Sequence, residues 1–453
     1  MIRSLGILGI LLGSIAFIIM NPAIGVMMWT WVSIMNPHRL AYGFAHNFPV
    51  AYLIGGATIL GWLVSKDSRK LPPHPIVILL IVYFFWTCIT TVFAYDDTAP
   101  DKWLQYMKIV LFAILTMSIM KSRNRLHALV WMNVLCIGFF AIKGGLFTIV
   151  TGGGNRVWGP PGSFIGDNNA LGLAMVMTLP LLRYIYAQTD HKYVRWGING
   201  ASLAWLAGIL GTQSRASFVA LGCMLIFLWL KSKNKLITGL LLVFAASMAV
   251  AFMPASFHNR MDTIESYDQD PSFMGRVYMW QFALKVARDN PILGGGFNVF
   301  YDENLRNLYL PEGVAGRAVH NVYFEVLGEH GYIGLALFMS IGIWAFFSCS
   351  RVIGLTSKRP DLKRANDLAR MAQVSLVGYA VNGLTVNLAT FDLYYTVLGI
   401  IVLNRYLVGE ALKVPLPGIS MDRRWKPEGP SGLPEPQASL ATTDSSSAST
   451  FAN

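Results

Sequence analysis

The sequence predicts an all-α, polytopic membrane protein with about twelve transmembrane helices. Of its 453 residues, 54% are hydrophobic and only 13% are charged, which is about half the charged share of an ordinary soluble domain. Apolar runs of about 17–25 residues recur along the chain, and each can cross a hydrocarbon core about 30 Å thick. The formal net charge of +12 is then explained by basic cytoplasmic loops, and no nucleic-acid partner is expected.

The expected membrane spans begin with an N-terminal run that imitates a signal peptide. Because no small-residue cleavage site follows it, we expect a retained first helix. Asn21-Pro22 either kinks this helix or separates two helices, so the total is twelve or thirteen. In chain order the expected spans are Ile7–Met35, Val50–Val64, Pro75–Phe93, Tyr106–Met120, Leu126–Val150, Phe164–Tyr186, Trp196–Leu210, Ala216–Leu230, Leu236–Met253, Val322–Ser348, Leu368–Leu384 and Leu393–Leu407.

The charge of the loops between these spans alternates along the chain. Basic loops lie at residues 66–70, 121–125, 191–195, 231–235 and 351–364. The positive-inside rule assigns them to the cytoplasm, so the long polar loop is expected to face outward. The sequence thus predicts an N-terminal transmembrane bundle, an outward loop with short surface helices, C-terminal transmembrane helices and a disordered cytoplasmic tail. Their bounds are residues 1–253, 254–320, 321–410 and 411–453.

The long loop carries side chains suited to an anionic, ring-bearing substrate. Arg276 and Trp280 are four residues apart in a segment of helical character, so they lie on one face of a helix. There they either form a structural cation–π pair or bracket a ligand, with Arg276 on a diphosphate and Trp280 on a sugar or prenyl group. Further on, Gly294-Gly295-Gly296 either brings backbone amides to a phosphate or forms a turn.

Arg215 stands between two apolar runs, at the expected outer face of the membrane. A charged side chain near the bilayer core is costly and usually has a partner. Arg215 therefore either extends to a lipid phosphate or grips a substrate phosphate with its planar guanidinium.

His320 and Asn321 close the long loop at the start of a membrane span. Asn321 is well placed to cap the helix that begins near Val322. The partial positive charge of a helix N-terminus disfavours the imidazolium form of His320 and keeps its ring able to accept a proton. His320 is then either an ordinary interfacial histidine or, together with the arginines, a general base that activates a hydroxyl group.

A second outward connection carries polar groups beside glycines. Lys143 precedes two glycines, Arg156 lies in a glycine-rich stretch, and Asn169 follows Asp167 at the expected start of the next helix. These groups either hydrogen-bond sugar hydroxyls or form ordinary caps and turns, and the sequence leaves both open.

No cofactor or metal is expected. The four cysteines lie in or beside apolar runs without metal-ligand spacing. Asp268-Gln-Asp270 has the form of a metal-binding motif but lacks the strand-rich domain that accompanies it in nucleotide-sugar enzymes.

These motifs, in this order and spacing, resemble the O-antigen ligase/Wzy polymerase superfamily over roughly residues 50–410. The likeness is carried by Ser214-Arg-Ala-Ser217, by Gly275-Arg-x-x-x-Trp280 with Asn290-Pro-x-x-Gly294, and by His320-Asn321-x-x-x-Glu325 with Gly331-x-x-Gly334. Within the superfamily, Asn36-Pro-His-Arg39 and the stretch from Lys143 to Asn169 resemble the O-glycosylation ligases associated with exosortase systems.

The resemblance implies a GT-C-like, metal-independent glycosyltransferase of the bacterial inner membrane with its active site facing the periplasm. Such an enzyme takes a glycan from undecaprenyl diphosphate and passes it to lipid A-core, to a growing polysaccharide or to a protein hydroxyl. By motif, Arg215 and Arg276 would hold the diphosphate and His320 would activate the acceptor. The remaining expected substrate-binding residues are Trp280, Asn321, Asn169, Lys143 and Arg156.

Two other functions stay open on the sequence. A Wzy-type polysaccharide polymerase would use the same chemistry and differ only in its acceptor. A transporter or flippase of a lipid-linked sugar would use the arginines to bind without cleaving. Transporters commonly carry paired broken helices near the bilayer midplane, whereas the sequence offers one such break, at Asn21-Pro22.

Overall fold

The structure, a computed structural model, describes residues 2–40, 48–67, 69–231, 271–311 and 318–413, together with a few single positions between these ranges. The chain divides into two compact units, Met1–Glu410 and Ala411–Asn453. Most of the expected span Leu236–Met253, the loop residues 254–270 and the expected tail from residue 414 onward lie outside the described residues.

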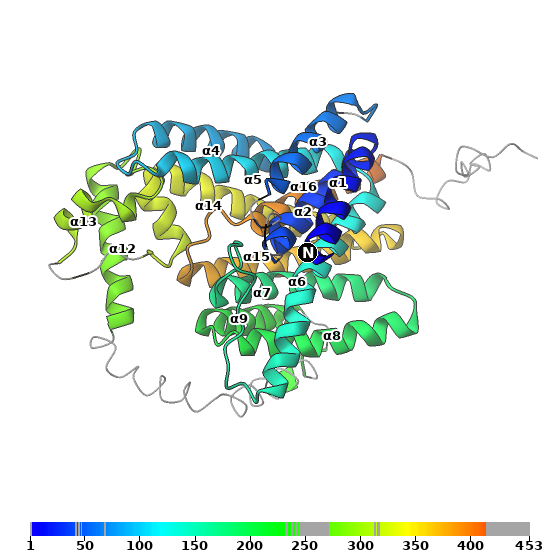
Figure 1. Ribbon diagram of the computed structural model, residues 1–453. Coiled ribbons are helices and arrows are strands. Elements are labelled where there is room, and N and C mark those ends of the chain that lie inside the picture. The colour runs from blue at the N-terminus through cyan, green and yellow to red at the C-terminus, as the bar shows by residue number, and fades with distance from the viewer. Residues whose placement is uncertain are drawn as a thin grey trace, which may run out of the picture. The chain divides into compact units, whose positions relative to one another are not determined.

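Every regular element in the described residues is helical (Figure 1). The α-helices are α1 (Ile2–Met20), α2 (Pro22–Met35), α3 (Val50–Val64), α4 (Pro75–Val92), α5 (Ala99–Ile119), α6 (Arg123–Val150), α7 (Asn168–Gln188), α8 (Lys192–Gly211), α9 (Arg215–Lys231), α12 (Pro271–Asp289), α13 (Glu303–Tyr309), α14 (Val322–Thr356), α15 (Lys363–Asn382) and α16 (Asp392–Leu412). Short 3₁₀ helices are η1 (Pro37–Leu40), η4 (Val299–Tyr301), η5 (Pro360–Leu362) and η6 (Gly383–Thr385). The predicted all-α class is confirmed, and each expected span that falls in the described residues overlaps one of these helices.

Within the described residues, six helices are long and apolar enough to cross a membrane. They are α4, α5, α6, α7, α14 and α16. Three shorter apolar helices, α1, α2 and α3, precede them. The chain is therefore a polytopic membrane protein, as predicted, while the total of about twelve spans stays a prediction.

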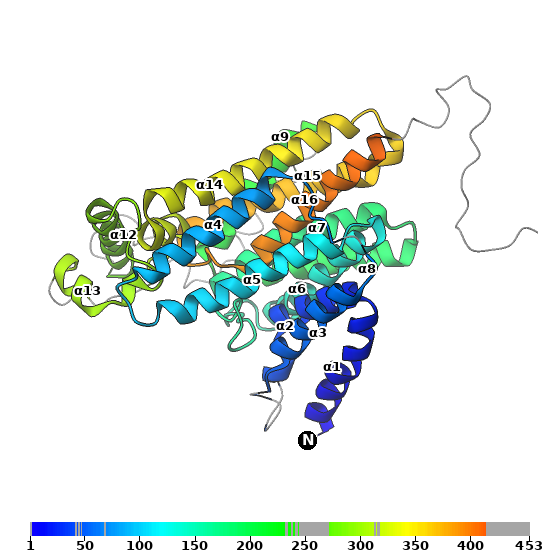
Figure 2. The same ribbon diagram turned by 90° about the horizontal axis from the view of Figure 1, so that it is seen from above.

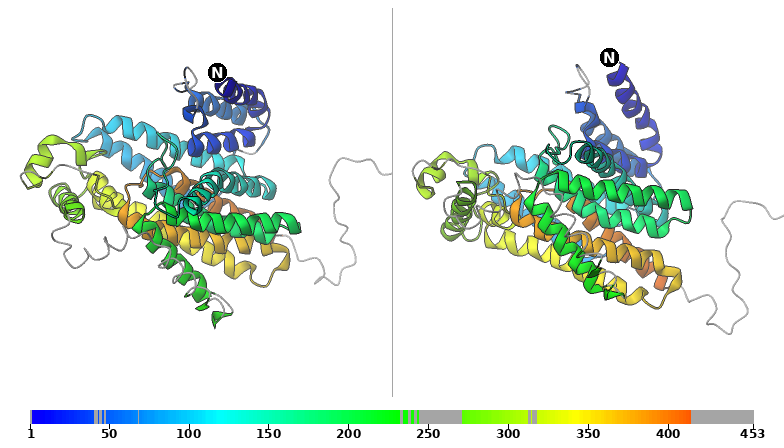
Figure 3. Two further views of the ribbon diagram at one scale, coloured as in Figure 1. Left: turned by 60° about the horizontal axis from the view of Figure 1, so that its bottom comes forward. Right: turned by 90° about the horizontal axis from the view of Figure 1, so that it is seen from below.

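The break at Asn21-Pro22 separates two helices. Asn21 is extended and its side-chain oxygen accepts a hydrogen bond from the backbone N–H of Ala23 over 3.3 Å, while Pro22 opens α2. Pro is favourable at the first position of a helix, where its missing N–H costs nothing. α1, α2 and α3 then pack on one another at one side of the unit, drawn in blue in Figures 2 and 3.

α15 is less apolar than the other long helices of the bundle, and it can be so because other helices surround it. It packs against α7, α9 and α14. The buried Gln373 donates through its side-chain amide to Phe346 O over 3.2 Å, and the buried Ser375 hydroxyl donates to Met177 O over 2.6 Å. A helix surrounded by other helices can carry polar groups that a lipid-facing helix could not leave unpaired.

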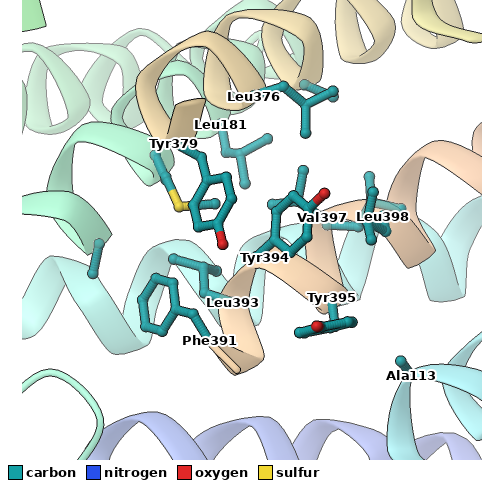
Figure 4. Close-up of a cluster of buried hydrophobic side chains, with 14 of the residues drawn as sticks. Ala113, Leu181, Leu376, Tyr379, Phe391, Leu393, Tyr394, Tyr395, Val397 and Leu398 are labelled. Atoms are coloured by element: carbon teal, nitrogen blue, oxygen red, sulfur yellow. The ribbon is translucent and has the colours of Figure 1, made fainter. Parts of the chain in front are cut away.

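Tyrosines at the contact of α15 and α16 organise the irregular connection between these helices. The rings of Tyr379 and Tyr394 are stacked with centroids 4.1 Å apart, and Tyr395 lies nearby on α16 (Figure 4). The Tyr379 hydroxyl donates to Leu388 O over 2.9 Å, and the Tyr395 hydroxyl donates to Ala389 O over 3.0 Å. Non-helical backbone buried at membrane depth needs such partners, so the tyrosines hold the connection of residues 383–391 in place.

His74 caps α4 and joins it to α14. The backbone N–H of Ile76 donates to His74 Nδ1 over 3.2 Å, and His74 Nε2 lies 3.1 Å from Ser348 Oγ. Because Nδ1 accepts a hydrogen bond, the capping ring is the neutral form, with its proton on Nε2. Burial, with a smaller contribution from Arg405, lowers the pKa of His74 to about 4.

We expect this cap to weaken in acid. The unfolded imidazole takes up a proton near its ordinary pKa of about 6.5, whereas the folded ring resists protonation until about pH 4. The stabilisation is therefore complete above about pH 6.5 and is lost as the pH falls toward 4. His74→Asn keeps a capping oxygen without a titrating ring, so its thermal midpoint should fall less than that of the wild type between about pH 7 and pH 5. Equal falls, measured by tryptophan fluorescence, would contradict this assignment.

Candidate functional site

Several sequence motifs meet at one end of the helical bundle. α9 begins at Arg215, Asn321 caps the start of α14, and α15 ends at Asn382. The hydrogen bonds described below join these three helix ends. We call this end of the bundle, defined by Arg215, Asn321 and Asn382, the motif face.

A buried hydrogen-bond chain joins α9 to the end of α15. Asn382 Nδ2 donates to Ser217 Oγ over 3.0 Å, and the Ser217 hydroxyl donates to Ser214 Oγ over 3.1 Å. All three side chains are buried. Among the described residues, Asn382 Oδ1 has no hydrogen-bond partner, so a buried acceptor beside the Ser-Arg-Ala-Ser segment is left for a water or a ligand hydroxyl.

Arg215 projects from a backbone that is fixed on both sides. Before it, the buried Asn168 at the start of α7 donates through Nδ2 to Thr212 O over 2.9 Å. After it comes Ser217, held as described above. Arg215 itself is exposed, in the first turn of α9. An arginine held in this way on an exposed helix end is suited to an anionic ligand.

Asn321 caps α14 as predicted. Its side-chain oxygen accepts hydrogen bonds from the backbone N–H groups of Tyr323, at 2.9 Å, and Phe324, at 3.2 Å. Its Nδ2 donates to Leu384 O over 3.2 Å, in the connection between α15 and α16. Asn321 is thus a buried structural link, and a contact with substrate stays a prediction.

His320 has an unusual backbone conformation next to this cap. Its φ is 47°, in the left-handed region that residues other than glycine seldom adopt. Its backbone N–H donates to Asn387 Oδ1, so the same connection that holds Asn321 also holds His320. Backbone of this kind often occurs where a side chain must be aimed, and the His320 side chain is half-buried at the motif face.

α12 brings Trp280 onto the His320 segment. Trp280 Nε1 donates to Val319 O over 3.0 Å, and its ring stacks on that of Phe324 with centroids 5.6 Å apart. α12 is also anchored by the buried side chains of Met279, Phe282, Ala283, Val286 and Ala287. Arg276, half-buried, precedes Trp280 by about one turn on the same face of α12.

Only part of the connection between α6 and α7 lies near the motif face. The backbone N–H of Val157 donates to Gly211 O over 2.8 Å, which brings Arg156 beside the turn before α9. The Arg156 guanidinium lies over the ring of Trp158, 5.7 Å from its centroid. Asn169 is half-buried in the first turn of α7, capped by Asp167. Lys143, by contrast, is exposed on α6, about two turns before that helix ends.

The three consecutive glycines form a turn whose amides are occupied. The backbone N–H of Gly295 donates to Gly328 O and that of Gly296 donates to Glu329 O, both over 2.8 Å. These carbonyls are freed because α14 breaks at Gly331, where φ is 67°. A Cβ on Gly294 would lie 2.5 Å from the Gly331 nitrogen. The turn reading is therefore correct, and the phosphate-cradle reading is not supported.

Sequence reasoning missed a buried ionic cluster in the first half of α14. Lys102 Nζ of α5 lies 2.9 Å from Glu325 Oε1 and 2.7 Å from Glu329 Oε1. Both glutamate side chains are 2% exposed and that of Lys102 is 21% exposed. The backbone N–H of Ala389 donates to Glu325 Oε2 over 3.1 Å, and that of Asn298 donates to Glu329 Oε1 over 3.0 Å.

The cluster had a signal in the sequence. Glu325 and Glu329 are four residues apart and so share one face of a membrane-spanning helix. Two carboxylates on one face of such a helix require a cation and further donors, and Lys102 is the basic residue near the outer end of the expected neighbouring span. The pattern predicts the need for a partner, but only the fold identifies it.

In the described residues, no group of three or more His, Cys, Asp and Glu side chains is arranged to hold a metal ion. Asp268 and Asp270 lie outside the described residues.

The fold and this face define a polytopic, all-α membrane protein with cationic and polar side chains gathered at one end of its bundle. Residues 200–339 match the family model described as O-antigen ligase. That segment contains Arg215, Arg276 and His320. Residues 2–189 match a second model, described as a family of unknown function, DUF5935.

A curated relative is the exopolysaccharide production protein ExoQ of Rhizobium meliloti (strain 1021). It is 30% identical to this chain over 116 residues. The alignment covers 24% of this chain and 27% of ExoQ, so it spans about a quarter of either protein.

Lys102→Met should destabilise the fold strongly. It leaves two buried carboxylates without their cation, which costs about 3–5 kcal/mol and should lower the thermal unfolding midpoint of the purified protein. Lys108→Met is the matched control, since Lys108 lies on the same helix and makes an exposed bond to the Tyr52 hydroxyl; its effect should be below about 1 kcal/mol. Adding Glu329→Gln to Lys102→Met should recover part of the loss. Equal midpoints for the two single variants would show that the cluster does not stabilise the fold.

Proposed function

We propose that this protein is a membrane glycosyltransferase of the O-antigen ligase type. It transfers a glycan from undecaprenyl diphosphate to an acceptor hydroxyl at the periplasmic face of the bacterial inner membrane. The observation that carries the proposal is that two parts of the segment matched to the O-antigen ligase model are hydrogen-bonded to one stretch of chain. The start of α9, which bears Arg215, is bonded through Ser217 to Asn382 at the end of α15, and the backbone N–H of His320 donates to Asn387 in the connection that follows. Arg276 lies one turn before Trp280, whose indole donates to the residue before His320, Val319.

The proposed reaction needs a base and stabilisation of the leaving group. The acceptor hydroxyl oxygen attacks the anomeric carbon, and its proton passes to His320. The bond between that carbon and the diphosphate oxygen breaks, and both electrons leave with the diphosphate. Arg215 and Arg276 stabilise the departing charge through bidentate hydrogen bonds. The half-buried position of His320 supports its role as the base.

Other residues are assigned to substrate binding within the same proposal. Trp280 and Asn321 position the base through their bonds to Val319 and Leu384. Arg156 and Asn169 offer hydrogen bonds to sugar hydroxyls, supported by the link between their connection and the turn before α9. Lys143 is assigned a more distant part of the glycan, because it lies on the exposed side of α6.

A ligase and a polymerase of this type differ in the acceptor that receives the glycan. The similarity to exosortase-associated O-glycosylation ligases favours a protein acceptor. The similarity to ExoQ, an exopolysaccharide production protein, instead favours a growing polysaccharide as acceptor, as in a Wzy-type polymerase.

A turnover assay tests the function directly. Purified protein in lipid vesicles is given undecaprenyl-diphosphate glycan with protein, lipid and oligosaccharide acceptors, and products are read by mass spectrometry. Glycan on a protein or lipid acceptor is expected for a ligase, and longer lipid-linked chains for a polymerase. His320→Ala should lower kcat by about 10²–10⁴-fold, the usual contribution of a general base. A donor that is moved across the bilayer but never cleaved would instead identify a transporter.

Arg276→Ala should slow turnover at saturating donor. Loss of a group that stabilises developing charge typically costs about 10²–10³-fold in kcat, and Arg276→Lys should restore only part because it lacks the planar fork. Arg288→Ala is the matched control, since Arg288 is an exposed arginine near the other end of α12. If kcat for Arg276→Ala equalled that of the control, Arg276 would not stabilise the leaving group.

A further inference from the structure

A cavity lies at the opposite end of the bundle from the motif face. Its volume is about 510 Å³, and it lies between α6, α7, α15 and α16. α7 and α16 begin at the motif face and end at this cavity, while α15 begins here and ends at the motif face. The volume is within the range of small-molecule sites, about 300–1,000 Å³. We call it the basic cavity.

The charged side chains at its rim are mostly cationic. Arg123, Lys363 and Arg364 line it and are exposed. The acidic lining residues are Asp190 and Asp361. Asp361 is already paired with the guanidinium of Arg359, at 2.8 Å, so its charge is largely compensated. The remaining balance favours an anionic ligand.

Two helix N-termini add to this preference. α6 begins at Arg123 and α15 begins at Lys363, both in the lining. The residue that precedes α15, Leu362, offers no side-chain cap to the first N–H groups of that helix. Ser122 caps α6, and the backbone N–H of Lys363 donates to Pro360 O. What the two helix starts offer a phosphate is therefore their partial positive charge.

A buried donor lies deeper in the basic cavity. Trp131 Nε1 donates to His127 Nε2 over 3.0 Å, and His127 Nδ1 lies 3.2 Å from the Tyr184 hydroxyl. Because an indole N–H can only donate, His127 Nε2 is an acceptor and the ring proton is on Nδ1, which donates to Tyr184. The hydroxyl hydrogen of Tyr184, a lining residue that is 4% exposed, is left for an acceptor inside the cavity.

The lining also has an apolar part. Leu126, Leu368, Leu407 and Val408 complete the walls. The apolar helix α6 begins here, and the apolar helices α7 and α16 end here, so the cavity lies at the depth where lipid headgroups meet the hydrocarbon. A free phosphate ion would use the cations but not the apolar walls, whereas a phospholipid uses both.

We propose that the basic cavity binds the headgroup of an anionic phospholipid. Its phosphate lies against Lys363, Arg364 and the start of α15, an oxygen of the headgroup accepts the hydrogen bond of Tyr184, and the first methylene groups of the chains lie along the leucines. This site is separate from the proposed glycosyl transfer and does not depend on it.

Native mass spectrometry of the delipidated full chain in detergent tests the proposal. The probes are phosphatidylglycerol, phosphatidylcholine with the same chains, and glycerophosphoglycerol, which is the headgroup without chains. We expect one phosphatidylglycerol per chain, held about tenfold or more tightly than phosphatidylcholine. Retention of both lipids to the same extent would overturn the proposal, because the cations would then have no role. Binding of glycerophosphoglycerol as tight as that of the lipid would overturn the assignment to a lipid.

Variants locate the binding in this cavity. Lys363→Ala with Arg364→Ala should weaken phosphatidylglycerol binding about tenfold or more, and Tyr184→Phe should weaken it about fivefold. The control is Arg351→Ala with Lys358→Ala, two exposed basic residues of the same basic loop region that do not line the cavity. Unchanged binding in both cavity variants, or an equal loss in the control, would contradict the site.

Discussion

The ionic cluster of Lys102 with Glu325 and Glu329 is the constraint on which the first half of α14 and its neighbours depend. A charge withdrawn from water must be matched by an opposite charge and by further hydrogen-bond donors. Here Lys102 pairs with both carboxylates, and each carboxylate also accepts a hydrogen bond from one backbone N–H group. The cluster therefore joins α5, the first half of α14 and the connection before α16. His320 and Asn321 lie directly at the start of that segment of α14.

The rest of the motif face follows from the same need to satisfy polar groups away from water. The connection of residues 383–391 is irregular, yet tyrosines and Asn321 occupy its carbonyl groups. α15 leads into this connection, and its polar residues are tolerated because it lies among other helices. α15 therefore begins at the basic cavity and ends at the motif face, and polar side chains gather at both of its ends.

The sequence alone predicted the helices and the Asn321 cap because both depend on local patterns. Apolar run length identifies spans, and an asparagine before an apolar run identifies a cap. It could not choose between one and two helices at Asn21-Pro22, because a proline fits the first turn of a helix as well as a kink. It could not identify Lys102 as the partner of the glutamates, since more than 200 residues separate them and local spacing carries no information on such pairs.

The proposed roles of Arg215, Arg276 and His320 came from short motifs, and the fold adds that the segments bearing Arg215 and His320 are both bonded to the end of α15 and the connection after it. These bonds, through Ser217, Asn382 and Asn387, involve residues whose types are ordinary in a membrane helix. The glycine turn was ambiguous for a similar reason. Whether its amides are open to a ligand depends on the break of α14 at Gly331, which lies more than thirty residues further along the chain.

The break at Gly331 also has a consequence for biogenesis. It leaves three carbonyl groups of α14 without partners in their own helix, and their donors are Gly295, Gly296 and the indole of Trp86. All three donors precede α14 in the sequence. During synthesis they have therefore already left the ribosome when α14 emerges, and the broken helix enters the bilayer with its hydrogen-bond partners available to it.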